Sequence, residues 1–199
     1  MCNLYTMSSN VDAMRALFGR FKGDTGNLPA YDAIYPNRAA PVLHKDSDGL
    51  ALATMLWGVP PPANVARPVT NVRNLASPFW RSMLAKPEQR CLVPVTAFCE
   101  WTGDKGSKRQ VWFAMRDSNP FAFAGIWRPS DEGPRMAFLT CAPNALVGAV
   151  HPKAMPVILA PGDYATWLDG SFDQATALAK PFRDDAMAII ERGEARLKV

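Results

Sequence analysis

A cysteine at position 2, in the opening segment "MCNLYTM", has the most distinctive chemistry in this sequence. Because an initiator methionine before a small residue is commonly removed, Cys2 would then carry a free α-amine beside its thiol. Their ordinary pKa values, about 8 and about 8.5, leave a fraction of each group deprotonated at neutral pH. An aldehyde could form a Schiff base with this amine, which the sulfur would close to a thiazolidine ring. The alternative is a half-buried thiol near a frayed terminus.

Two further side chains could move protons. Glu100 lies in "AFCEWTGDKGSK", inside an apolar strand and just before a glycine-containing turn. Burial there would raise the pKa of its carboxyl, as a general acid requires, unless it points to solvent from an edge strand. His151 follows a short apolar helix, whose negative end favours imidazolium, and its alternative is a surface or capping role.

A basic stretch suggests a nucleic-acid partner. Residues 67–90 contain five basic side chains and one acidic one, interleaved with Phe79 and Trp80. Such a stretch could hold phosphates while an aromatic ring stacks on a base, although a solvated helix face gives the same pattern. In "TNVRN", the Asn71 amide can donate and accept hydrogen bonds, and the Arg73 guanidinium can bind a phosphate with two donors.

Composition limits the class of protein. The chain has 199 residues, 48% hydrophobic and 20% charged, with a formal net charge of +4, which is typical of one globular domain. We expect a cytoplasmic protein without a membrane span, because no apolar run is long enough and no signal peptide is recognisable. With two histidines and no CxxC spacing among the four cysteines, we expect neither a metal site nor any other cofactor.

The elements that must position these residues are mostly strands. Helical spacing predicts a helix over 11–21, capped from residues 8–10, and another over "SPFWRSMLAKPEQ", ended by Pro87. "PVLHKD" and "ALATMLWGVP" predict a hairpin, and a meander is expected over "RCLVPVTAFCEWT", "RQVWFAMRD", "FAFAGIWRP" and "RMAFLTCAP". "NALVGAVH" predicts a short helix, "MPVILA" a last strand, and "GDYATWLDG" and "SFDQATALAK" terminal helices. We therefore expect an α+β single domain with a β-rich, largely antiparallel, barrel-like core flanked by short helices.

The order of the motifs is more specific than any one of them. The sequence shows "MCNLY", "WGVP", "TNVRN", "RCLVPVTAFCEW", "FAFAGIW", "LTCAPN" and "VHPKAMPVIL" in succession. It resembles the SOS response-associated peptidase (SRAP) family over 1–199, most strongly over 2–168, while 180–199 match weakly. In three places it departs from the family pattern. Residues 60–62 are prolines where a tryptophan is common, and Cys99 stands where an aromatic residue is frequent. In "HPKAMP" the interval from His151 to "MP" is one residue longer than usual, with Lys153 in place of an arginine.

The resemblance implies a function in the DNA damage and SOS response. A protein of this family would sense abasic sites in single-stranded DNA and cross-link to them covalently through Cys2 as a thiazolidine, after a peptidase-like self-processing that removes Met1. Glu100 and His151 would serve the acid–base steps, including lyase-type reversal by Glu100, and Asn71 would bond near the N-terminus or the lesion. We expect a monomer that becomes nucleoid-associated when bound to DNA.

By the same resemblance and the basic stretch, five residues would contact DNA. Arg73 would bind a flanking phosphate and Thr140 would reach the strand backbone, and we add Trp57, Lys153 and Arg67. Two other functions remain open. One is a noncovalent module that binds single-stranded DNA, and the other is a cysteine peptidase that uses Cys2 with His151 on proteins in trans.

Overall fold

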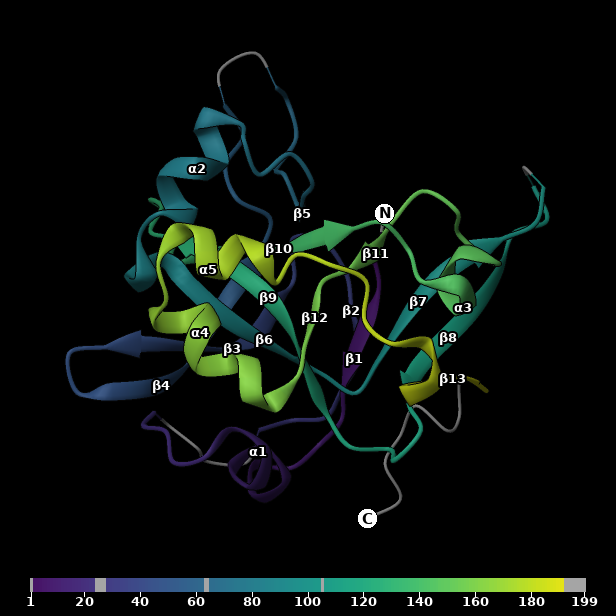
Figure 1. Cartoon of the computed structure of the whole chain (residues 1–199), viewed down its shortest axis with the longest axis horizontal. Coiled ribbons are helices and arrows are strands. Elements are labelled where there is room, and N and C mark those ends of the chain that lie inside the picture. Colours follow the sequence, from purple (N-terminus) through teal and green to yellow (C-terminus); the bar gives the residue numbers. More distant parts are fainter. Residues whose placement is uncertain (1, 24–27, 63–64, 105, 192–199) are drawn as a thin grey trace.

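The computed structural model, drawn in Figure 1, describes residues 2–23, 28–62, 65–104 and 106–191. The described chain forms two β-sheets with short helices around them, so the predicted α+β class is confirmed. The strands are β1 (Tyr5–Met7), β2 (Tyr31–Ile34), β3 (Ala39–Asp46), β4 (Gly49–Trp57), β5 (Asn71–Val72), β6 (Arg90–Val95), β7 (Ala97–Thr102), β8 (Arg109–Met115), β9 (Phe121–Arg128), β10 (Arg135–Cys141), β11 (Met155–Pro156), β12 (Ile158–Leu159) and β13 (Met187–Ile190). The α-helices are α1 (Val11–Phe18), α2 (Pro78–Leu84), α3 (Ala145–Gly148), α4 (Tyr164–Asp169) and α5 (Phe172–Ala177), and the 3-10 turns are η1 (Pro87–Gln89), η2 (Pro161–Asp163) and η3 (Asp184–Ala186).

The larger sheet closes on itself. Its strands follow the order β4, β3, β6, β9 and β10, and β10 pairs with β4 as well as with β9, which completes the ring. All pairs in this ring are antiparallel except β10 with β4, where Arg135 lies opposite Leu56. Closure leaves no free edge along the ring. The predicted barrel-like core is therefore present.

Aromatic side chains fill the interior of the barrel. Phe138 stacks on Trp57 with ring centroids 5.0 Å apart, and Phe123 lies 4.8 Å from Phe138. Tyr5 enters from β1 and meets Trp57 edge-on at 5.2 Å. Each such pair contributes about 0.5–1.5 kcal/mol beyond the burial of its area. The aromatic cluster thus ties the N-terminal strand to the barrel.

The smaller sheet has the order β13, β8, β7, β1 and β2. The expected meander differs from the observed path, because the chain leaves the barrel after β6, forms the β7–β8 hairpin in this second sheet and returns to the barrel as β9. Thr96 separates β6 from β7 and shares a 2.8 Å hydroxyl–hydroxyl hydrogen bond with Thr6 next to it. The single strand expected over 90–102 is therefore two strands in two sheets.

The predicted helices form with small changes of boundary. Asn10 caps α1, and its side chain accepts from the Ala13 amide at 2.9 Å. Ser77 precedes α2 as expected, but its side chain makes no capping hydrogen bond, and Pro87 begins η1 instead of ending α2. The helices α4 and α5 are not the last elements of the described chain, because β13 follows α5 and pairs with β8 at four positions.

Arg90 is buried, although the sequence placed it in the basic stretch. Its side chain is 0% exposed; Nε donates to the carbonyl of Leu84 at 2.8 Å, and Nη1 donates to those of Trp167 at 3.0 Å and Gly170 at 2.7 Å. Burial lowers the pKa of this guanidinium. Arg90 therefore fixes the ends of α2 and α4 to the barrel and offers no charge to a phosphate.

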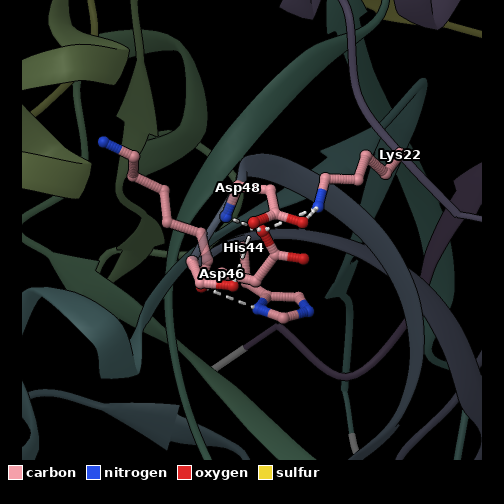
Figure 2. Close-up of polar contacts among 6 residues, drawn as sticks. Lys22, His44, Asp46 and Asp48 are labelled. Carbon is pink, nitrogen blue, oxygen red and sulfur yellow. Dashed lines mark hydrogen bonds and ion pairs between the residues drawn. The ribbon is translucent and has the colours of Figure 1, made fainter.

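A charged cluster closes the tip of the β3–β4 hairpin (Figure 2). Lys22 forms ion pairs with Asp46, at 3.5 Å, and with Asp48, while His44 lies beside them with Nδ1 3.1 Å from the carbonyl oxygen of Lys45. The cluster anchors the segment after α1 to the hairpin. Over the described ranges, no three histidine, cysteine or acidic side chains are grouped so as to hold a metal ion. None of the described helices is long and apolar enough to cross a membrane.

Candidate functional site

Cys2 lies just before β1 and is buried. Its side chain is 1% exposed, and Sγ donates to the carbonyl oxygen of Leu4 at 3.5 Å. The chain holds this position because Leu4 accepts a 2.9 Å hydrogen bond from the amide of Cys99, which extends the β1–β7 pairing toward the terminus. Burial raises the pKa of the Cys2 thiol well above its ordinary value, and the nearby charge of Glu100 adds to the rise. The thiol is thus protonated at neutral pH.

Asn71 connects Cys2 to the barrel. It begins the two-residue strand β5, which pairs with β10 where Asn71 lies opposite Phe138. Its Nδ2 donates to the carbonyl oxygen of Cys2 at 3.0 Å and to Oγ1 of Thr70 at 2.9 Å. Its Oδ1 is buried and has no hydrogen-bond partner within the described part of the chain. One face of the amide therefore positions Cys2, and the other remains able to accept a hydrogen bond.

Glu100 is the buried carboxyl of the site. It lies on β7, is 2% exposed, and its Oε1 has no hydrogen-bond partner among the residues described. Burial raises the pKa of Glu100 to about 7 because a carboxylate loses its hydration in an apolar setting. Its effect on the Cys2 thiol places the two groups within electrostatic range of each other. A carboxyl with this pKa can both give and take a proton at neutral pH.

His151 follows α3 and is half-buried. Its amide donates to the carbonyl of Val147 at 2.8 Å, and its Nδ1 lies 3.1 Å from the carbonyl oxygen of Ala154. Burial lowers the pKa of the imidazole. The expectation that the helix end favours imidazolium is therefore wrong, because loss of hydration outweighs the backbone hydrogen bonds at Ala154 and His151, which raise this pKa. His151 is neutral at pH 7 and can accept a proton.

Strand pairing brings the segments that carry Asn71 and His151 to the same end of β10, where β5 and β11 pair with it (Figure 1). β11, four residues after His151, pairs with the last residues of β10, with Met155 opposite Cys141. β5, which carries Asn71, lies along the same strand. Asn71 donates a hydrogen bond to the backbone of Cys2, and the charge of Glu100 acts on the Cys2 thiol. The candidate site therefore combines groups from four separate segments.

The five residues expected to contact DNA divide into two groups. Arg73, Lys153 and Arg67 are exposed. Arg73 follows β5 directly and lies close enough to β10 for its charge to act on Cys141, whose pKa burial raises to about 11 against the opposing effect of Arg73. Arg73 is thus an accessible cation beside the site.

Trp57 and Thr140 do not fit the expected role. Trp57 is 0% exposed, and its Nε1 donates to the carbonyl oxygen of Thr70 at 3.0 Å. Thr140 is 3% exposed and donates from Oγ1 to the carbonyl oxygen of Val72 at 3.3 Å. Trp57 thus holds the residue before β5, and Thr140 holds β5 itself. Because both side chains are buried in these contacts, the expectation that they touch DNA directly is wrong.

Sequence reasoning missed two supporting contacts. Thr70 accepts from the Asn71 amide, and Nε1 of Trp101 donates to Oδ1 of Asn3 at 3.2 Å, one residue from Glu100 and one from Cys2. The sequence held a weak signal for these contacts, because Thr70 lies next to Asn71 and Trp101 lies next to Glu100. Their pairing partners are distant in sequence, so no local pattern could assign them.

We compared the sequence of the chain with models of known protein families. The model of the SOS response associated peptidase (SRAP) family matches residues 1–193. The chain belongs to the SRAP family. The resemblance of its motifs to SRAP proteins is therefore confirmed, and the match reaches beyond β13.

Solved structures share the SRAP fold of this chain. A protein from Bacteroides thetaiotaomicron has a TM-score of 0.76 at 21% identity, with 96% of this chain and 92% of that one covered. A protein from Bordetella bronchiseptica has a TM-score of 0.77 at 23% identity, covering 96% and 100%. A phage-related protein from the same organism has a TM-score of 0.75 at 22% identity, covering 95% and 93%. No curated protein matches this chain.

Proposed function

We propose that this SRAP protein captures abasic sites in single-stranded DNA as a covalent thiazolidine on Cys2, and so shields the lesion during the DNA damage response. The observation that supports this most is the pairing of a buried Glu100 carboxyl, with a pKa of about 7, with the Cys2 thiol on which its charge acts. A buried acid and a thiol held together by β1 and β7 suit a reaction that needs both proton donation and a sulfur nucleophile.

The chemistry is a condensation in two steps. After removal of Met1, whose placement lies outside the described residues, the Cys2 α-amine adds to the aldehyde carbon of the ring-opened abasic sugar. The carbonyl oxygen leaves as water when the C=N bond of the Schiff base forms. The Cys2 sulfur then adds to the same carbon, the thiol proton leaves, and the C=N π electrons take up a proton at nitrogen. One water is lost overall, and nothing is oxidised or reduced.

Glu100 would serve both steps. In its protonated form it gives a proton to the departing hydroxyl of the carbinolamine, and the resulting carboxylate can then accept the proton of the Cys2 thiol. That second transfer matters because burial keeps the thiol protonated at neutral pH. A pKa of about 7 populates both forms of Glu100, so one group can act as acid and then as base. The same proton transfers in reverse would assist release of the DNA.

Asn71 and His151 would complete the site. Asn71 holds the Cys2 backbone, and its buried Oδ1 lacks a partner in the described structure. An unsatisfied buried acceptor costs about 1–3 kcal/mol, which a sugar hydroxyl or the Cys2 amine would offset by donating to it. His151, neutral because burial lowers its pKa, would accept the proton that the α-amine loses as it attacks.

The strand would be held by exposed cations. Arg73 lies next to the site, and its guanidinium can bind a phosphate through two donors. Lys153 follows His151 closely, and Arg67 precedes β5, so both lie on segments that lead to the site. Phosphate contacts of this kind depend on salt and not on sequence, which suits a protein that recognises a missing base.

The word peptidase in the name of the family fits the removal of Met1, which must precede the condensation. Attack of the Cys2 thiol on the Met1 carbonyl carbon would break the C–N bond, form a thioester and free the amine that the condensation needs; water would then hydrolyse the thioester, which releases Met1 as the free amino acid and restores the thiol. We assign this self-processing to Cys2 as part of the proposal.

Intact-mass measurement tests the proposal. The purified protein is incubated with a single-stranded oligonucleotide that carries one abasic site, beside the Cys2→Ala variant and a Cys141→Ala control. We expect a heat-stable adduct equal to the oligonucleotide minus one water, on protein that has lost Met1, in the wild type and the control only. An adduct with Cys2→Ala, or DNA binding without any adduct in the wild type, would contradict it; the latter result would favour a noncovalent single-strand binding module.

A further inference from the structure

A small hollow lies on the barrel wall beside the end of α2. It has a volume of about 230 Å³, and its walls are formed by the end of α2, the turn into η1 and the end of β9. Its lining consists of Ser82, Met83, Lys86, Gln89, Arg128 and Pro129. None of the catalytic or DNA-contacting residues discussed above belongs to it.

The hollow contains two cations and no acid. Lys86 and Arg128 both line it, and neither forms an ion pair with a carboxylate in the described ranges. By contrast, the nearby Arg135 is paired with Glu132, and Lys45 on another face is paired with Asp169 at 2.6 Å. Two like charges in one concave site repel each other, and an anion between them would remove that cost.

Neutral groups in the hollow suit an oxyanion. The side-chain amide of Gln89 makes no hydrogen bond in the described structure and can donate, and the Ser82 hydroxyl stands beside it, at present donating to the carbonyl of Phe79 at 3.1 Å. Lys86 brings three donors, and Arg128 brings a planar set of five that matches the oxygens of a phosphate. Met83 supplies an apolar floor. The donors outnumber the acceptors, as a phosphate group requires.

The position of the hollow connects it with the candidate site. Arg128, at the end of β9, lies opposite Arg135, where β10 begins, and the far end of β10 reaches β5 and β11 at the site. β10 has seven residues, so the two ends are separated by about 20 Å at about 3.3 Å per residue. Stacked nucleotides repeat every 3.4 Å along a strand, and about six would cover this distance.

We propose that this hollow binds a phosphate group, and that in the complex with DNA it holds a backbone phosphate several nucleotides from the captured lesion. The second part rests on the proposed function. The hollow thus forms an outer contact that fixes the direction in which the strand leaves the site, while Arg73 acts at the lesion itself.

Equilibrium binding in a Cys2→Ala background tests the strand contact without any cross-link. Arg128→Gln and Lys86→Gln are compared with Arg20→Gln, which removes the same charge from an exposed position just after α1, on the opposite side of the molecule (Figure 1). For a twelve-nucleotide strand, we expect the slope of log K against log salt to fall by about 0.7 in the first two variants and to stay unchanged in the control. With a three-nucleotide strand, all variants should bind equally. If Arg128→Gln behaves as Arg20→Gln does on the long strand, the strand contact is wrong.

Titration with inorganic phosphate separates the two parts. Chemical shifts of the Gln89 side-chain amide should move with inorganic phosphate in the wild type and not in Arg128→Gln. Phosphate binding together with the changed salt slope supports the whole proposal. Phosphate binding without a changed slope assigns the hollow to free phosphate and overturns the strand contact. No phosphate binding overturns the site itself. A protein that binds no single strand at all contradicts the proposed function, while the phosphate titration still decides on the hollow.

Discussion

The side-chain amide of Asn71 donates a 3.0 Å hydrogen bond to the backbone carbonyl of Cys2 and so joins two segments that lie 69 residues apart. The contact involves the backbone of Cys2 and leaves its thiol and amine for chemistry. Its role is to fix the position of the proposed nucleophile, because the segment before β1 has few other partners among the described residues.

Removing this amide should slow capture more than it weakens DNA binding. Asn71→Ala deletes the bond to Cys2 and the buried acceptor, and a lost bond of 1–1.5 kcal/mol corresponds to roughly a tenfold lower rate of adduct formation. Asn74→Ala, in the exposed turn after β5, is the matched control. Single-turnover cross-linking at saturating DNA measures the rate. Equal rates for Asn71→Ala and the wild type would remove Asn71 from the site.

Glu100 should make stability depend on pH. Because burial raises its pKa from 4.5 to about 7, the folded state keeps a proton that the unfolded state releases between these values. Stability therefore falls as pH rises through this window, by up to about 3 kcal/mol. Urea unfolding of the wild type and Glu100→Gln at pH 5 and pH 8 isolates this effect, since His151, whose lowered pKa acts with the opposite sign, is common to both. A constant difference between the two proteins would contradict the raised pKa.

Arg90 should matter for stability and not for DNA. Arg90→Met leaves the carbonyls of Leu84, Trp167 and Gly170 without their donor, and we expect a loss of about 2–4 kcal/mol in the free energy of unfolding. Arg81→Met, on the exposed face of α2, removes only a cation–π contact with Phe172 at 4.3 Å and should cost less than about 1 kcal/mol. Chemical denaturation compares the two. Similar losses would mean that Arg90 is not the structural clamp inferred from its contacts.

Trp57 provides a test of its assignment to the core. Trp57→Phe keeps an aromatic ring against Phe138 but loses the hydrogen bond from Nε1 to Thr70, so we expect a loss of about 1 kcal/mol in stability. The affinity of the folded variant for single-stranded DNA should equal that of the wild type, as measured by fluorescence anisotropy well below the midpoint of unfolding. A large loss of affinity without a loss of stability would instead place the indole in contact with DNA.

Local patterns predicted most elements but few of their partners. The spacing of apolar residues after Asn10 gave α1, and the turn at residues 47–49 gave the β3–β4 hairpin, because these signals lie within the elements themselves. The strands β1, β5 and β13 have two to four residues, too few for a readable pattern, and their hydrogen bonds come from distant strands. The parallel contact of β10 with β4 is equally nonlocal.

For the candidate site, the sequence indicated residue types but not their environments. Cys2, Asn71, Glu100 and His151 were all identified from motif order. The sign of the His151 shift depends on how much of the imidazole is buried, which its position after a helix does not reveal. Likewise, Arg90 has the same flanking pattern as an exposed cation, and only the carbonyls of α2 and α4 explain its burial.

The pairing of β1 with β7 has a consequence for the order of events during translation. Thr6 and its hydroxyl partner Thr96 are 90 residues apart, so the strand that buries Cys2 is synthesised long after Cys2 itself. At about 5–20 residues per second, the ribosome needs about 5–20 s to reach β7. Once it leaves the ribosome, the nascent N-terminus is therefore open to cellular aminopeptidases before β7 exists to pair with β1.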